Sequence, residues 1–290
     1  MALIAAACGG DDAADTTTSA VVTTLPPLTS ATTTTAAAPS TTTSSTTTTT
    51  IPAGPPSLLN GLPVEDEALL ERRVVAIKVD NHPDARPQSG IQDAGAVIEL
   101  IVEAGITRFI ALFHATDSEY IGPVRSGRPT DPTLVRPLDA IFQISGALPW
   151  IQGVNRNAGV VFLGETSPNT FRIPRGGRAY ERTLYANSVA IREVADVRGM
   201  SDDPPSGQWF PFGEPTLATE AATDIALNWS GDWPTVHWIW DGEQYLRFNG
   251  ERLHEWVDQE GEGAQITADT HIVLFAPRYT ARPPGAGSSV

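Results

Sequence analysis

The sequence predicts an α+β protein in which a mixed α/β N-terminal domain is followed by a smaller, β-rich C-terminal domain. Three observations predict this organisation. Residues 15–56 consist mainly of Thr, Ser, Ala and Pro, a composition typical of a disordered tether. Residues 57–212 alternate apolar strand candidates with helix candidates. Residues 213–290 carry short alternating runs separated by Asp-Gly and Asn-Gly turn signals, and we expect the chain to end inside this second domain.

The composition excludes several classes of protein. The 290 residues carry a formal charge of -15 with only 19 Lys plus Arg, too few clustered cations for a general nucleic-acid binder. No apolar run reaches the roughly 18 residues that a membrane-spanning helix needs. We expect no cofactor, because Gly-rich phosphate loops are absent, and no metal site. The histidines do not fall in a metal-ligand spacing; they are His82, His114, His237, His254 and His271.

Residues 1–14 resemble the remnant of a bacterial lipoprotein signal peptide. Cys8, the single cysteine, follows Ala5, Ala6 and Ala7 and precedes a Gly-Gly pair, as in the cleavage box whose cysteine becomes lipidated. The positive and apolar segments that precede such a box are almost absent, so we expect the true start to lie upstream. The alternative is a cysteine without function in a disordered tail. A lasting anchor requires more than one acyl chain, because a single chain binds membranes only marginally.

The segment 15–56 contains almost no large apolar residues, so burial cannot offset the entropy of ordering it. Such a tether spans at most ~130 Å when extended and roughly 35 Å as a flexible coil. It serves either as an O-glycosylated stalk or only as a spacer. Together with Cys8, it predicts a lipid-anchored protein at the outer face of a bacterial cell membrane.

The first part of the N-terminal domain carries clear local signals. A short helix at residues 65–72 leads into a strand at Val74–Val79, and two prolines and a glycine make Asn81–Gly90 a loop at the end of that strand. A brief helix is expected at Ile91–Ala94. Strands at Ala96–Val102 and Arg108–His114, with a turn at Gly105 between them, predict a hairpin.

The second part of this domain predicts shorter elements. They are a helical turn at Asp131–Val135 with Pro132 at its first position, a strand at Leu138–Ile144, a helix at Trp150–Asn157 and a strand at Gly159–Gly164. Residues 167–179 are too rich in Gly, Pro and Arg for a helix or a strand. Residues 184–199 predict an amphipathic helix, because apolar residues recur close to helical spacing.

The C-terminal domain is expected to contain strands at Leu217–Leu227 and Thr270–Phe275, with turns at Asp241-Gly242 and Asn249-Gly250. Its aromatic residues predict one aromatic face that either stacks on sugar rings or forms the core of the sheet. The residues of this face are Trp238, Trp240, Tyr245 and Phe248.

Polar side chains gather inside and beside the first strands, where buried runs need none. The candidate ligand-binding residues are Asn81, Arg86, Gln88, Arg108, Arg125, Ser126 and Arg128. Guanidinium groups suit a carboxylate or phosphate ligand. Peptidoglycan termini and teichoic acids offer such groups outside the membrane, so an anionic cell-wall polymer or an envelope protein is the expected partner. The alternative is that these arginines pair with carboxylates of the chain, namely Asp80, Glu99, Glu103 and Asp139.

Glu99 and Glu103 are the candidate catalytic residues. Two carboxylates brought close together have pKa values that split, so that one serves as acid and the other as base. Alternatively, they neutralise Arg108, Arg125 or Arg128. The sequence therefore predicts either a binding or scaffold module or an envelope hydrolase or transferase, and it leaves open whether the protein is an enzyme.

Several motifs resemble those of the YerB-like family of bacterial lipoproteins, whose function is unknown. They are NGLP at 60–63, ARPQSG at 85–90, VIELIVEAGITRF at 97–109, GPVRSGR at 122–128 and, more loosely, the YLRFNGERLHEWVD stretch. The resemblance implies an N-terminal α/β domain, a smaller β-rich C-terminal domain and attachment to the membrane as a lipoprotein. It departs at Tyr180, Glu181 and Arg182, where family members tend to show Pro-His-Asn, so no histidine role is carried over there.

Overall fold

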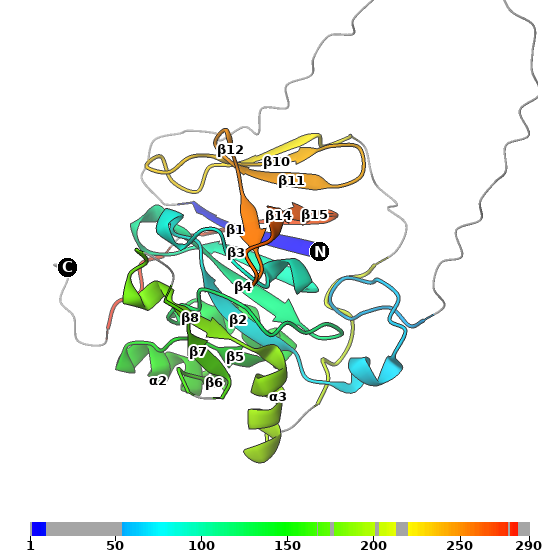
Figure 1. The fold of residues 1–290 in the computed structure, drawn as a ribbon, viewed down its shortest axis with the longest axis vertical. Coiled ribbons are helices and arrows are strands. Elements are labelled where there is room, and N and C mark those ends of the chain that lie inside the picture. The colour runs from blue at the N-terminus through cyan, green and yellow to red at the C-terminus, as the bar shows by residue number, and fades with distance from the viewer. Residues whose placement is uncertain are drawn as a thin grey trace, which may run out of the picture.

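The computed structural model describes residues 2–9, with respect to their backbone, and residues 54–166, 168–174, 177–200, 203–212, 220–277 and 279–283. Many strands in several sheets and a few short helices make up these residues (Figure 1), which confirms the α+β fold class. The tether predicted at residues 15–56 lies almost entirely outside the described residues. No helix among the described residues is long and apolar enough to cross a bilayer.

The largest sheet has seven strands in the order β16-β1-β3-β4-β2-β5-β6. Their bounds are β1 Ala2–Gly9, β2 Val75–Asp80, β3 Ala96–Ile101, β4 Thr107–Phe113, β5 Ile141–Gln143, β6 Val161–Leu163 and β16 Thr270–Pro277. β4 pairs antiparallel with both β2 and β3, whereas β2 pairs parallel with β5. The three strands predicted between residues 74 and 114 are therefore confirmed, including the hairpin.

The turn between β3 and β4 requires its glycine. Ala104 and Gly105 both adopt positive φ angles, 58° and 69°. A Cβ atom at Gly105 would also lie 2.5 Å from the Ser230 Oγ atom, which belongs to the C-terminal part of the chain. The hairpin tip and the loop that carries Ser230 are therefore in close contact, and a side chain at position 105 would force them apart.

The helices are short. Their bounds are η1 Glu67–Glu71, η2 Pro83–Ala85, η3 Ile91–Asp93, η4 Glu103–Gly105, α1 Asp131–Val135, η5 Arg136–Leu138, α2 Pro149–Asn157, η6 Tyr180–Arg182 and α3 Ser188–Val197, where η denotes a 3-10 helix. Pro132 is the second residue of α1 rather than the first. β5 is shorter than the predicted strand because η5 precedes it and Asp139, with φ 48°, adopts a left-handed conformation before it.

The segment 184–199 is a strand followed by a helix, and the prediction of one helix is wrong. β8, Leu184–Ala186, pairs antiparallel with β7, Thr170–Arg172, which lies in a segment predicted to have no regular structure. The helix α3 begins only at Ser188 because the Asn187 side chain accepts a hydrogen bond from the Ala190 N–H at 3.0 Å. Pairing with a separate segment overrides the local helical pattern here.

The C-terminal strands form a second sheet in the order β12-β11-β10-β9, with β15 also paired to β11. The bounds are β9 Asp224–Leu227, β10 Val236–Trp240, β11 Tyr245–Asn249, β12 Arg252–Leu253 and β15 Thr267–Ala268, and β13 Glu255–Val257 and β14 Gly263–Gln265 form a separate pair. Both predicted turns are confirmed, because Asp241-Gly242 connects β10 to β11 and Asn249-Gly250 connects β11 to β12.

The predicted aromatic face needs a correction. Trp238 is fully buried and lies opposite Arg247 in the β10–β11 pairing, and Trp240 lies opposite Tyr245. Phe248 lies opposite His237 and therefore points to the other face of the sheet. Trp238 packs with strands of the large sheet in one hydrophobic core, so the second sheet covers one face of the first.

The two ends of the described chain meet in the large sheet. β1 lies between β3 and β16 and pairs parallel with both, with Cys8 in register with Ala276. β16 is thus a strand of the seven-stranded sheet rather than of the C-terminal sheet. Figure 1 shows β1, in blue, next to β3.

Candidate functional site

A buried ion pair joins the two sheets. Arg247 of β11 donates from Nη1 to Glu99 Oε2 at 2.9 Å and from Nη2 to Glu99 Oε1 at 2.8 Å, and both side chains are 0% exposed. Glu99 Oε1 also accepts from the Thr107 hydroxyl at 2.6 Å and from Asn81 Nδ2 at 3.1 Å. The guanidinium of Arg247 lies 5.0 Å from the ring centroid of Trp238. The Glu99 carboxylate is therefore fully engaged by neighbours.

The ion pair continues into a chain of buried hydrogen bonds. Arg247 donates from Nε to His254 Nδ1 at 2.7 Å, and His254 Nε2 lies 2.7 Å from Gln88 Oε1. Burial, reinforced by the Arg247 and Arg86 guanidiniums, holds the pKa of His254 well below its usual value, so the ring is neutral. Because Nδ1 accepts a hydrogen bond, Nε2 carries the hydrogen and donates it to Gln88. Gln88 in turn donates to Asn81 Oδ1 at 3.0 Å.

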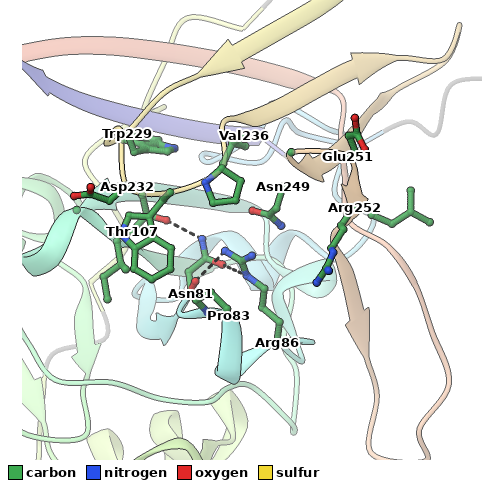
Figure 2. A pocket seen from close by; sticks show the side chains of 16 residues that line it. Asn81, Pro83, Arg86, Thr107, Trp229, Asp232, Val236, Asn249, Glu251 and Arg252 are labelled. Carbon is green, nitrogen blue, oxygen red and sulfur yellow. Dashed lines mark hydrogen bonds between the residues drawn. The ribbon is translucent and has the colours of Figure 1, made fainter.

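This series of hydrogen bonds ends at Asn81 and Arg86, which line a pocket of about 760 Å³. Four segments line it: the loop after β2 with Asn81 and Arg86, the tip of the β3–β4 hairpin, the loop between β9 and β10, and residues 249–253. Figure 2 shows Asn81 joined by hydrogen bonds to both Thr107 and Arg86 on one side, with Trp229 and Val236 on the other. The pocket is therefore built by both sheets and exists only when they are packed together.

Among the described residues, Arg86 lacks an ion-pair partner and Trp229 lacks a hydrogen-bond acceptor. Arg86 donates from Nε to Asn81 Oδ1 at 3.2 Å and from Nη2 to the Asn81 carbonyl at 3.0 Å, but it makes no ion pair in the part of the chain that the structure describes. Burial lowers the pKa of Arg86 to about 10, so it remains a cation at neutral pH. Trp229 is only 9% exposed, and its Nε1 donor has no hydrogen-bond partner.

Other candidate residues gather around Glu103 rather than in the pocket. Glu103 accepts from Arg108 Nη2 at 3.1 Å and from Arg128 Nε at 2.6 Å. Arg108 is 2% exposed and also donates to the Ser126 carbonyl at 2.8 Å, and burial lowers its pKa to about 10. The Ser126 hydroxyl lies 3.3 Å from that of Ser145. This cluster is an ion-pair network beside the tip of the β3–β4 hairpin.

Arg125 belongs to a third group, around Asp80. The Arg125 Nε atom lies 3.1 Å from Asp80 Oδ2, and Arg182 Nε lies 3.6 Å from the same oxygen. Asp139, the remaining carboxylate of the predicted pairing, lies 3.0 Å from Arg73 and 2.9 Å from Arg136. The structure thus divides the predicted residues: Asn81, Arg86 and Gln88 lie in or next to the pocket, whereas Arg108, Arg125, Ser126 and Arg128 lie in ion-pair networks.

Arg247, His254 and Trp229, from the C-terminal part of the chain, also belong to the site or its support, and none of them was predicted. A signal for Arg247 was present, because the Asp241-Gly242 turn sets a register in which Arg247 faces Trp238 on the inner side of the hairpin. A charged residue at an inward position of a strand requires a buried partner. No group of three or more metal-ligating side chains occurs among the described residues.

Comparison with known proteins identifies the family. Residues 59–201 match the family model described as "Protein of unknown function (DUF3048) N-terminal domain". The chain is 48% identical over 98 residues to the "Putative lipoprotein YerB" of Bacillus subtilis (strain 168), a match that covers 34% of this chain and 28% of that protein. The crystal structure of YerB from Bacillus subtilis is similar with a TM-score of 0.57 and 24% identity, over 73% of this chain and 79% of that one. The resemblance to the YerB-like family is therefore confirmed: residues 59–201 match the DUF3048 N-terminal domain, a family of unknown function, and the chain is similar to YerB in sequence and fold.

Proposed function

We propose that this protein is anchored through Cys8 at the outer face of a bacterial cell membrane and binds an anionic group of the cell envelope in the pocket at Arg86. The lipoprotein name of its relative YerB and the cleavage-box pattern before Cys8 support the location. The pocket between the two sheets supports the binding activity. The protein acts as a binding module, and the domain with its tether presents the pocket to the cell wall.

One observation carries the binding proposal: Arg86 is a partly buried cation without a carboxylate partner among the described residues. The other arginines of the predicted set each have one, since Arg108 and Arg128 pair with Glu103 and Arg125 pairs with Asp80. A guanidinium removed from water requires an anion to offset its lost hydration. An anionic ligand in the pocket supplies that anion.

The same geometry favours binding over catalysis. Both oxygens of Glu99 accept hydrogen bonds from Arg247, and the side chain is 0% exposed. A general base must reach the proton that it removes, which a sealed carboxylate does not. Glu103 is 54% exposed, but two guanidiniums hold it outside the pocket. Neither carboxylate is placed to act on a ligand bound at Arg86.

The proposal is tested by calorimetric titration of the purified protein with two soluble probes: a muropeptide with free carboxylates and a glycerol-phosphate oligomer. At least one is expected to bind, and Arg86→Gln is expected to weaken its binding by ~10-fold or more, because hydrogen bonds to charged groups contribute about 1.5–3 kcal/mol. Arg136→Gln is the matched control, since Arg136 is 53% exposed and pairs with Asp139 away from the pocket. Binding of neither probe, or unchanged affinity of a folded Arg86→Gln variant, overturns the proposal.

A further inference from the structure

The pocket contains charges of both signs. Besides the cations Arg86 and Arg252, its lining includes the carboxylates Asp232 and Glu251. None of the four makes an ion pair within the described residues. In Figure 2, Asp232 lies at one end of the pocket beside Trp229, whereas Arg252 and Glu251 lie at the other. A ligand with negative charge only would leave the Asp232 carboxylate facing it, which costs affinity.

The two carboxylates are not equivalent. Glu251 is next to Arg252 in the sequence, and both are exposed, so each screens the field of the other. Asp232 has no charged neighbour between residues 225 and 236. Its environment is aromatic, because Trp229 and Trp233 line the pocket with it. A carboxylate and indole rings that line the same pocket are the combination that recognises an ammonium group, through charge and aromatic faces.

The loop that carries Asp232 is held in place before any ligand binds. The Asp232 N–H donates to Ser230 Oγ at 3.4 Å, and Trp233 donates from Nε1 to the Ala104 carbonyl of the hairpin tip at 2.8 Å. The ring of Trp233 also meets the His82 ring edge-on, with centroids 5.9 Å apart. Contacts on both sides therefore fix the loop, so Asp232 loses little conformational freedom on binding.

We propose that the ligand is zwitterionic: it carries an ammonium group that binds Asp232 in the part of the pocket lined by Trp229 and Trp233, in addition to the anionic group that binds Arg86. This inference rests on the proposed function and narrows its ligand to an anion that contains an amine, such as the peptide portion of a cell-wall fragment. A pocket of about 760 Å³ is large enough for such a ligand, since small-molecule sites span ~300–1,000 Å³. A polymer of phosphodiesters without amines has no ammonium group with which the Asp232 carboxylate could pair.

The test uses two probes that differ in one group: a muropeptide whose stem peptide has a free side-chain amine, and the same muropeptide with that amine acetylated. Calorimetric titration of the full chain is expected to show ~10-fold tighter binding of the free amine, because a charged hydrogen bond contributes about 1.5–3 kcal/mol. Asp232→Asn is expected to abolish this preference, and it should not weaken the binding of the acetylated probe, because it removes the carboxylate that faces the anion. Arg86→Gln is expected to weaken the binding of both probes.

Controls separate the two proposals. Glu243→Gln removes an exposed carboxylate of the same sheet outside the pocket and is expected to keep the preference, and Asp232→Glu is expected to restore part of it. Equal binding of both probes by the wild-type protein, or a preference that persists in a folded Asp232→Asn variant, overturns the zwitterion inference while the anion site stands. Binding of neither muropeptide overturns the zwitterion inference, and the anion site then stands only if the glycerol-phosphate oligomer binds and Arg86→Gln weakens that binding. The melting temperature of each variant reports whether it is folded.

Discussion

Glu99 and Arg247 are 148 positions apart in the sequence and form a two-bond ion pair that is closed to solvent. One belongs to the large sheet and the other to the C-terminal sheet. Replacing both with apolar residues is often tolerated in proteins, whereas removing one leaves a buried charge without compensation. The pair therefore makes the packing of the two sheets, and the pocket between them, sensitive to a single substitution.

Glu99→Gln is expected to lower the free energy of unfolding by about 3–5 kcal/mol, because it leaves the Arg247 guanidinium buried without a counter-ion. Glu165→Gln, the matched control, is expected to cost about 1 kcal/mol or less, since Glu165 is 39% exposed and its partner Arg172 is 21% exposed. Urea denaturation measures both. Similar losses for the two variants would show that burial does not distinguish these carboxylates.

Stability is expected to fall as the pH is lowered from about 6.5 towards about 4. Burial lowers the pKa of His271 to about 4, whereas an unfolded histidine has a pKa of about 6.5. In that window the unfolded state binds a proton that the folded state does not, so stability is fully present above about pH 6.5 and is lost at up to ~1.4 kcal/mol per pH unit. His254, with its lowered pKa, acts in the same direction.

Urea denaturation between pH 4.5 and 7.5 measures this dependence. His271→Gln is expected to reduce the slope by about one proton. His237→Gln, which removes a partly exposed histidine beside Asp224, is the control. An identical slope for wild type and His271→Gln would contradict the assignment of the effect to this buried ring.

Gly105→Ala is expected to lower both the stability and the ligand affinity. The substitution places a Cβ at a φ of 69° and 2.5 Å from Ser230 Oγ, and strain of this kind costs ~1–3 kcal/mol. It also displaces the loop that carries Asp232. Gly153→Ala is the matched control: it lies in α2 with nothing within 4 Å of the added Cβ, and it should stabilise the helix by roughly 0.5–1 kcal/mol.

Deleting residues 2–9 is expected to destabilise the protein and to speed amide hydrogen exchange in β3 and β16. β1 pairs with both strands, and each backbone hydrogen bond contributes roughly 0.5–1.5 kcal/mol. Affinity at the pocket should change little, since no residue of β1 lines it. Unchanged exchange in β3 after the deletion would show that β1 does not stabilise this sheet.

Local signals predicted much of the fold. The β3–β4 hairpin followed from Gly105 between two β-branched runs, and the C-terminal turns followed from their Asp-Gly and Asn-Gly pairs. Elements that depend on pairing with distant segments could not be predicted from local signals. β7 and β8 pair with each other against their local composition and helical pattern, because tertiary packing outweighs propensity over such short segments.

The candidate site shows the same division. Asn81 and Arg86 could be recognised from one segment, since polar residues after a buried strand predict a binding loop. The partner of Glu99 could not be recognised from the sequence, because several arginines closer to Glu99 in the sequence were equally plausible partners. Only the packing of the two sheets selects Arg247, and it thereby assigns Glu99 to the ion pair.

The position of Cys8 in β1 has a consequence for how far the pocket reaches from the membrane. Under the anchoring proposed above, cleavage of the Ala7-Cys8 bond removes Ala2–Ala6, which are all of the β1 residues that pair with β3. The same eight residues then serve either as a strand or as the point of attachment, and not as both in one molecule. Before cleavage, residues 2–9 complete the large sheet as β1. After cleavage, the sheet lacks this strand, and the tether holds the domain and its pocket up to ~130 Å from the lipid surface.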